Sequence, residues 1–338
     1  MKLSLISTVF ISVLLQLFIL HDQSCSQPDE VAEYYTVQVA SFPIADSVKA
    51  FDLYHQLKEK NYLVFLSKTW IKDRGRWLRV RIGYFDSNSG ATRFALEFQE
   101  KENRDYYITK TKLEVASHSQ GFRIIYTPSA IWYQDDNGVR EVFDLSKSLT
   151  NTNIEADYAT PSISPNGQYV LFEYDSHIYV FDLKTWNWRI IQSDVTNSLP
   201  QMSPSSKYVA YTDLNLWEAQ GNLWLIDLTA DNKTTCLVEC RGTGNNTVKY
   251  FRWHPQKDII IYVEGYAYGT VSVGGSIYSV DTAGNIRALI KPPAERTEIY
   301  SRFSISNDSL HYRVAHFDEQ YMRSETTEHV VALEKLER

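Results

Sequence analysis

Hydrophobic positions between residues 34 and 112 follow the periods of strands and helices in turn. Residues 35–40 and 77–82 alternate with period two, as half-buried strands do, and residues 63–66 and 106–109 form two shorter apolar runs. Two stripes at helical spacing separate these segments. They consist of Val48, Phe51, Tyr54 and Leu57, and of Ala91, Phe94, Ala95 and Phe98. The order β-α-β-β-α-β predicts an α+β domain of the split βαβ type over residues 34–112.

Both helices of such a domain cover the same face of the sheet. Leu78, Val80 and Ile82 must point to these helices, because apolar burial is available there. The opposite face then carries Gln38, Trp77, Arg79 and Arg81. An indole ring can lie flat on a sugar, an amide can pair with hydroxyl or acetamido groups, and guanidinium groups can pair with carboxylates. The set therefore favours a ligand platform, although a Trp at the sheet rim beside two solvated Arg side chains would give the same pattern.

A repeated pattern occupies residues 120–338. In each repeat a turn such as Ser164–Gly167 precedes an apolar strand, and a second strand that often ends in Asp-Leu follows. The Asp can bond back to turn amides, and a unit that cannot bury its own sheet must stack on the next. The repeats begin near residues 128, 165, 204, 255 and 307, at spacings of roughly 37 to 52 residues. We therefore expect a five-bladed, all-β propeller, with six blades as the alternative, and we expect residues 122–126 to add an outer strand to the last blade and close the ring.

The first 26 residues have the pattern of a secretory signal peptide. Lys2 precedes the apolar run 3–20, and small residues at Ser24 and Ser26 suit cleavage before Gln27. A retained membrane anchor is one alternative, and lipid attachment at Cys25 is another, although Asp22 stands where a lipobox has an apolar residue. Export predicts a location in the periplasm or cell envelope.

Cysteine content, motifs and net charge bear on disulfide formation, on metal or cofactor binding and on affinity for nucleic acid. After removal of the signal only Cys236 and Cys240 remain, and an oxidising compartment would favour a small-loop disulfide between them, with two thiols as the alternative. No metal-ligand spacing and no cofactor motif occurs. The net charge of −7 argues against general affinity for nucleic acid, because there is no large basic field to displace counterions.

The first domain resembles SPOR, the sporulation-related repeat domain. Residues 35–42 (YTVQVASF) are similar to its opening signature, and residues 77–85 (WLRVRIGYF) to its second signature, with Tyr84 in place of the usual Pro. The resemblance implies binding to denuded glycan strands of peptidoglycan by the helix-free face of the sheet. The binding positions of the family fall on Gln38, Ser41, Trp77 and Arg79, with Arg81 beside them and Tyr107 or Ile108 as a further contact from the last strand.

The repeats of the second domain resemble the blades of TolB-type propellers, best in the second and third repeats. Together the two resemblances indicate a non-catalytic adaptor that holds glycan and presents its propeller to a protein partner of the envelope, in division or in envelope maintenance. A propeller hydrolase targeted to peptidoglycan and a ligand sensor are the alternatives. The only nucleophile pattern, around Ser272, lacks the first Gly of G-x-S-x-G, and His177, His254, His311 and His316 are scattered over different repeats.

Overall fold

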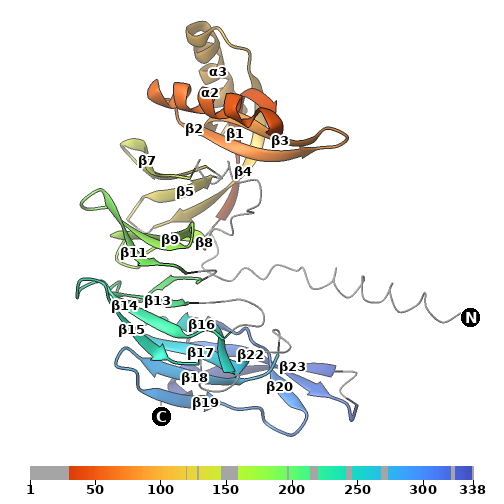
Figure 1. Ribbon diagram of the computed structural model, residues 1–338, viewed down its shortest axis with the longest axis vertical. Coiled ribbons are helices and arrows are strands. Elements are labelled where there is room, and N and C mark those ends of the chain that lie inside the picture. The colour runs from red at the N-terminus through yellow and green to blue at the C-terminus, as the bar shows by residue number, and fades with distance from the viewer. Residues whose placement is uncertain are drawn as a thin grey trace, which may run out of the picture.

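A computed structural model describes residues 30–336, except 119, 128, 146–158, 196–197, 214–219, 241–245, 268–272 and 321–323. The predicted signal segment, Cys25 and Ser272 lie outside the described residues. Figure 1 shows a helix-bearing part at one end of the long axis and a series of small sheets that follow one another along it. We call residues 30–117 the N-terminal unit.

The N-terminal unit has the predicted split βαβ order, which is confirmed. Its elements are β1 (Glu30–Pro43), the 3-10 helix η1 (Ile44–Asp46), α2 (Ser47–Glu59), β2 (Val64–Ile71), β3 (Gly75–Phe85), α3 (Asn88–Glu102) and β4 (Tyr107–Ser117). Helix α3 begins where Ser87 Oγ accepts a hydrogen bond from the Gly90 N–H, and it ends at Asn103 in the left-handed conformation. The strand order is β2-β3-β1-β4, with both helices on one face.

The sheet of the N-terminal unit does not stop at β4. The end of β4 pairs with β5 (Arg123–Thr127), and β6 (Ala130–Asp135) and β7 (Gly138–Asp144) follow, so one sheet has the order β2-β3-β1-β4-β5-β6-β7. The prediction that residues 122–126 close the ring on the last blade is therefore wrong. A tight turn at residues 118–122 returns the chain beside β4, and a local hairpin forms at a smaller entropic cost than pairing across two hundred residues.

Four further antiparallel sheets follow along the chain, which gives five in all among the described residues. The second contains β8 (Ala159–Ile163), β9 (Tyr169–Tyr174), β10 (His177–Asp182) and β11 (Asn187–Ser193), and the third β12 (Gln201–Met202), β13 (Tyr208–Thr212), β14 (Leu223–Asp227) and β15 (Lys233–Val238). The fourth contains β16 (Asn246–Trp253), β17 (Ile259–Tyr266), β18 (Ser276–Asp281) and β19 (Ile286–Ile290). The fifth contains β20 (Thr297–Ile299), β21 (Ser304–Ser306), β22 (Ser309–Phe317) and β23 (Ser324–Ala332), before the short helix α4 (Leu333–Leu336).

The repeated Asp residues hold turns, as the sequence predicted. Asp182 Oδ1 accepts the Lys184 N–H at 2.8 Å, and Asp227 and Asp281 accept N–H groups two residues ahead in the same way. The Ser residues before the apolar strands act similarly, since buried Ser164 Oγ accepts the Tyr169 N–H at 2.8 Å. These bonds explain why the repeat shows in the sequence.

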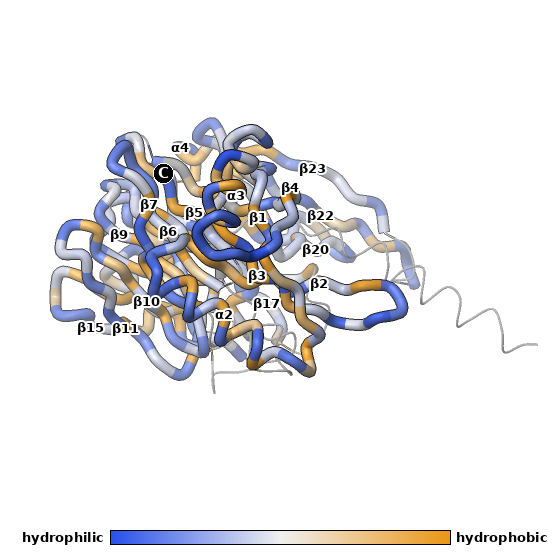
Figure 2. Tube along the Cα trace, turned by 90° about the horizontal axis from the view of Figure 1, so that it is seen from above, coloured by the Kyte–Doolittle hydropathy of each residue, from blue (hydrophilic) through white to orange (hydrophobic). Residues whose placement is uncertain are grey.

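Each sheet buries its faces against its neighbours. Separate core clusters join the first sheet to the second, the second to the third, the third to the fourth and the fourth to the fifth. Figure 2 shows the hydrophobic segments mostly within the strands and the hydrophilic ones at the turns. Successive four-stranded sheets packed face to face are the architecture of a β-propeller, so the predicted fold class is confirmed. Figure 1 places the first and last sheets at opposite ends of the stack.

The predicted Cys236–Cys240 disulfide is not formed in the structure. Cys236 lies on β15 and Cys240 is buried in the core between the third and fourth sheets. An extended strand carries the chain away by about 3.3 Å per residue, and a disulfide needs Cα atoms within about 7 Å. Burial raises the pKa of the Cys240 thiol to about 12, so it behaves as a small core residue.

Two further features concern the described residues only. None of their helices has the length and apolar character needed to span a bilayer. Within the same part of the chain, no group of three or more His, Cys, Asp or Glu side chains is arranged to hold a metal ion.

The two large indoles Trp132 and Trp188 differ in burial, which predicts different costs of truncation. Trp132 is 1% exposed and Trp188 is 53% exposed. Trp132→Ala should lower the free energy of unfolding by about 3–5 kcal/mol, because it leaves a cavity, whereas Trp188→Ala should cost about 1 kcal/mol or less. Urea unfolding of both variants measures the difference, and equal losses would show that Trp132 does not anchor the first sheet.

Candidate functional site

Strand β3 separates the two faces of the N-terminal sheet as predicted. Leu78, Val80 and Ile82 are each at most 1% exposed and pack under α2. The alternate residues Trp77, Arg79 and Arg81 lie on the other side, which we call the helix-free face. The registers of β1, β2 and β4 against one another arrange this face in cross-strand rows.

Three rows contain the predicted binding residues. Arg81 lies between Gln38 and Phe65, and Gln38 in turn pairs with Tyr107. The next row is Ser41–Arg79–Ser67, and the row nearest the β2–β3 turn is Pro43–Trp77–Thr69. The structure therefore brings Gln38, Ser41, Trp77, Arg79 and Arg81 onto one face.

A bulge in β1 is needed to place Gln38 and Ser41 together. Strict alternation would put an even and an odd residue on opposite faces. The register shifts between Gln38 and Ala40, so that Val39 is an extra residue, and Ser41 then pairs with Arg79. Of the two further contacts named from the last strand, Tyr107 is on this face and is 67% exposed, whereas Ile108 packs on the helix side near Val37.

The two arginines form the most unusual part of the face. Arg81 is only 6% exposed, and burial together with the neighbouring charge of Arg79 lowers its pKa to about 10. The buried Nε atoms of Arg79 and Arg81 and the buried Oγ of Ser67 have no hydrogen-bond partner among the described residues. Buried donors and charges are normally paired, because an unpaired one costs free energy. Three unpaired donors on adjacent strands can together receive an anionic or hydroxyl-rich ligand.

Trp77 lies at the outer end of the same face. It is half-buried, and its indole N–H donates to the Arg74 carbonyl at 3.1 Å. This bond fixes the ring beside the β2–β3 turn. Trp70, on β2, is 70% exposed, and its register partner is Arg76. Since Trp77 pairs instead with Thr69, the two indoles point to opposite faces of the hairpin.

The helix-free face is not open along its whole length. The β5–β6 hairpin (residues 123–135) covers the end of the face that holds Thr36, Phe65 and Tyr84. We call this the upstream end and the hairpin its cover. Trp132 stacks there on Tyr84 at 5.7 Å between ring centroids, and its ring lies at a steep angle to Phe65, also at 5.7 Å. Tyr34, Leu113, Val115, Ile125 and Ala130 complete this apolar cluster. The covered residues Thr36 and Phe65 have no exposed surface.

A second bulge turns Tyr84 toward this cover. Thr36 of β1 faces both Gly83 and Tyr84, and Gly83 has φ +62°, a left-handed conformation that glycine adopts at little cost. The extra residue brings the Tyr84 ring onto the helix-free face. The position at which this chain departs from the SPOR pattern therefore supplies the surface on which Trp132 packs.

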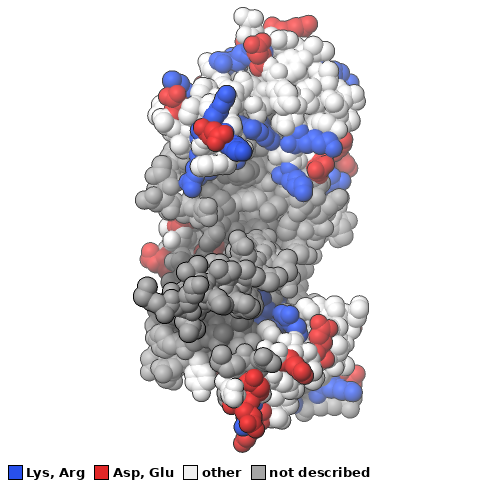
Figure 3. All heavy atoms as spheres, turned by 90° about the vertical axis from the view of Figure 1, so that its right-hand side faces the viewer, with Lys and Arg blue, Asp and Glu red and all other residues white. Residues whose placement is uncertain are grey.

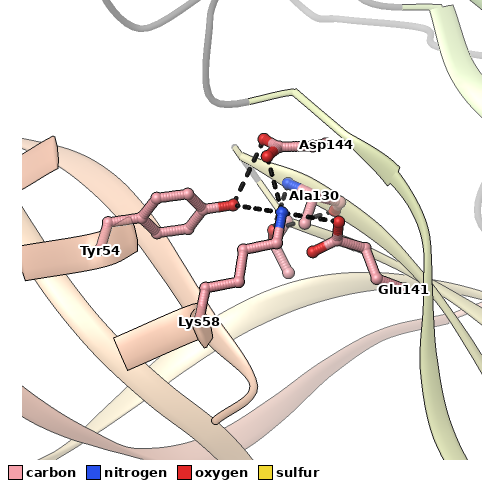
Figure 4. A network of polar contacts seen from close by, with 6 residues as sticks. Tyr54, Lys58, Ala130, Glu141 and Asp144 are labelled. Atoms are coloured by element: carbon pink, nitrogen blue, oxygen red, sulfur yellow. Dashed lines mark hydrogen bonds and ion pairs between the residues drawn. The ribbon is translucent and has the colours of Figure 1, made fainter. Parts of the chain in front are cut away.

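Polar contacts fix the cover from two further sides. The Leu66 N–H on β2 donates to Ser129 Oγ at 2.8 Å. Figure 4 shows Lys58 of α2 between the carboxylates of Asp144 and Glu141, at 2.6 and 2.7 Å, with the Tyr54 hydroxyl donating to Asp144 at 3.3 Å. Burial disfavours the charged amine, but the bonds to Asp144 and Glu141 outweigh it and raise the pKa of Lys58. Asp144 occupies the repeat position whose counterparts hold turns, and here it binds the N-terminal unit.

On the side drawn in Figure 3, Lys and Arg side chains lie among Asp and Glu side chains over the N-terminal unit. The histidines that could have served an enzyme are not brought together. His177 contacts the Asp175 carbonyl, His254 the Gln256 N–H, His311 the Ser306 hydroxyl and His316 the Thr327 hydroxyl, in three different sheets. These contacts support turns and strand pairs.

Comparison with known families identifies the first part of the chain. Residues 32–109 match the model of the SPOR domain, so the resemblance is confirmed, and residues 210–333 match a domain of unknown function, DUF4652. A search of curated proteins found no match.

Three solved structures show the range of structural similarity. A Clostridium novyi protein described as a conserved lipoprotein is 20% identical, with 42% of this chain and 91% of that chain covered and a TM-score of 0.37. Oligogalacturonate lyase from Vibrio parahaemolyticus is 10% identical, with 64% and 59% covered and a TM-score of 0.44. A protein described as TolB from Agrobacterium tumefaciens is 12% identical, with 80% and 90% covered and a TM-score of 0.36. Similarities of this size say nothing about function.

The burial of Arg81 predicts that removing its charge stabilises the fold. The pKa of Arg81 is lower in the folded protein than in the unfolded chain. Its buried charge therefore destabilises the fold fully below about pH 10, and this destabilisation decreases as the pH rises above that value. At pH 7, Arg81→Met should therefore raise the free energy of unfolding by about 1–2 kcal/mol.

Arg76→Met is the matched control, because Arg76 is exposed on the same strand. It should change the free energy of unfolding by less than about 0.5 kcal/mol. Destabilisation by Arg81→Met in urea unfolding would show that the guanidinium is already satisfied in the folded protein.

Proposed function

We propose that this protein binds the glycan strands of peptidoglycan through the open part of the helix-free face. SPOR domains bind peptidoglycan, and residues 32–109 form one. The observation that carries the proposal for this chain is the group of unpaired buried donors, Ser67 Oγ, Arg79 Nε and Arg81 Nε. A functional site is where a fold tolerates such groups, since a ligand satisfies them.

The open part of the face suits a sugar that carries a carboxylate. Trp77 offers a ring plane, Gln38 and Ser41 offer hydrogen bonds to hydroxyl and acetamido groups, and the two guanidinium groups attract an anion. Denuded glycan exposes the lactyl carboxylate of muramic acid, which is tied up in an amide while the stem peptide is attached. Removal of the peptide therefore creates the group that Arg79 and Arg81 would bind.

We infer that the sheets after β7 act as a binding module that presents a surface to a protein partner. The contacts of the four histidines above serve turns and strands, which supports a non-catalytic role. The signal-like segment and the SPOR domain both support an exported protein of the cell envelope, and action at division or in envelope maintenance remains part of this proposal.

Two matched pairs of variants test the glycan face. Trp77→Ala should weaken binding to amidase-treated sacculi about thirtyfold, as expected for loss of about 2 kcal/mol at an anchor residue. Trp70→Ala removes the same side chain from the opposite face and should leave binding unchanged. Likewise Arg79→Ala should weaken binding, whereas Arg76→Ala should not.

Sedimentation of the full-length protein with purified sacculi measures these affinities. Circular dichroism confirms that each variant is folded. Equal binding by Trp77→Ala and Trp70→Ala would show that the helix-free face does not bind the glycan. Equal binding to sacculi before and after removal of stem peptides would show that the lactyl carboxylate does not contribute to binding.

A further inference from the structure

The β2–β3 hairpin extends beyond the helices that cover the rest of its sheet. Lys68 pairs with Leu78, the last residue of β3 in this direction that packs under α2, and the strands continue from there to the turn at residues 72–74. No residue of 68–76 belongs to a core cluster. Figures 1 and 2 both show the hairpin projecting from the N-terminal unit. A projecting hairpin without a part in the core is available for contact with another surface.

The projecting part of the hairpin is basic, although the whole chain has a net charge of −7. Residues 68–76 contain four cationic side chains and a single acidic one, Asp73. The four cations are exposed, and none forms an ion pair or a side-chain hydrogen bond with the described residues: Lys68, Lys72, Arg74 and Arg76. Charges more than about 10 Å away are largely screened at 0.1 M salt. An anionic surface that meets this tip therefore experiences the local positive charge and not the net negative one.

Trp70 adds an exposed apolar group close to the turn. It is 70% exposed and lies opposite Arg76, two residues before the turn. Two residues of strand span about 7 Å, and segments that lie in a membrane interface bury their apolar side chains about 5–10 Å deep. Indole rings favour the headgroup layer, where Lys and Arg side chains can meet lipid phosphates.

The shape of the tip favours a membrane over a protein partner. A stable protein interface buries a broad surface, of about 800 Å² on each side. Trp70 is the one exposed large apolar side chain of residues 68–76, and it stands on a two-stranded hairpin. One indole surrounded by unpaired cations has the composition of an interfacial membrane contact.

We propose that the β2–β3 hairpin docks the protein on an anionic phospholipid surface, with Trp70 in the headgroup layer and the four cations of the hairpin against lipid phosphates. Trp70 and Trp77 point to opposite faces of the hairpin, so the side that meets lipid is not the side that would hold glycan. The inference does not depend on the proposed glycan function. Where both hold, the hairpin lies between peptidoglycan and a membrane.

Co-sedimentation of the full-length protein with lipid vesicles tests the proposal. The protein should bind vesicles of equal parts phosphatidylglycerol and phosphatidylcholine at about 0.1 M salt, and should not bind phosphatidylcholine alone. Lys72→Gln and Arg74→Gln should each weaken binding about fivefold. Trp70→Ala should weaken it at least as much, because the indole no longer leaves water. Lys184→Gln and Trp188→Ala are the matched controls, since both residues are exposed on the β10–β11 hairpin, and they should leave binding unchanged.

The outcomes separate membrane docking from the proposed function. Absence of binding to phosphatidylglycerol vesicles, with sacculus binding intact, would overturn membrane docking alone. Equal vesicle binding by Trp70→Ala and Trp188→Ala would also overturn it, because the hairpin would then attract polyanions without entering the headgroup layer. Folded Trp70→Ala should still bind amidase-treated sacculi, and loss of that binding would place Trp70 in the glycan site and contradict the separation of the two faces. Vesicle binding without sacculus binding would contradict the glycan proposal and leave membrane docking in place.

Discussion

Strand β4 is the element on which the whole arrangement depends. Its first part pairs with β1 inside the SPOR domain, and its last four residues pair with β5 of the first propeller sheet. Because one strand belongs to both parts, their relative position is fixed by backbone hydrogen bonds and not by a linker. The Trp132–Tyr84 stack and the Lys58 ion pairs then hold the curled sheet in place.

This constraint connects stability with function. The SPOR face would normally be free on its helix-free side, but here its upstream end contributes to a core with Trp132 at the centre. Burial of that end stabilises the junction. In the neighbouring row, Arg81 is buried, which lowers its pKa, and its Nε has no hydrogen-bond partner among the described residues. The fold therefore carries a local cost where the ligand is expected, as binding sites often do.

The sequence predicted the helices, strands and repeats because each depends on local signals. The period of β3 separated Leu78 from Arg79, and the repeated Asp and Ser residues marked turns that the structure confirms. It did not predict the joined sheet, the cover or the absence of the disulfide. Each of these depends on long-range packing, and the relevant residues, such as Tyr84 and Trp132, look locally like ordinary strand residues. The bulges at Val39 and Gly83 also break the alternation on which sequence reasoning relies.

The central claim is that glycan binds the open part of the helix-free face, beside the end that Trp132 covers. The most direct measurement is a crystal structure of the full-length protein with a short denuded oligosaccharide. The account predicts a sugar ring on Trp77 and a carboxylate bonded to Arg79 and Arg81, with Trp132 still stacked on Tyr84. A strand that lies elsewhere on the molecule would contradict it.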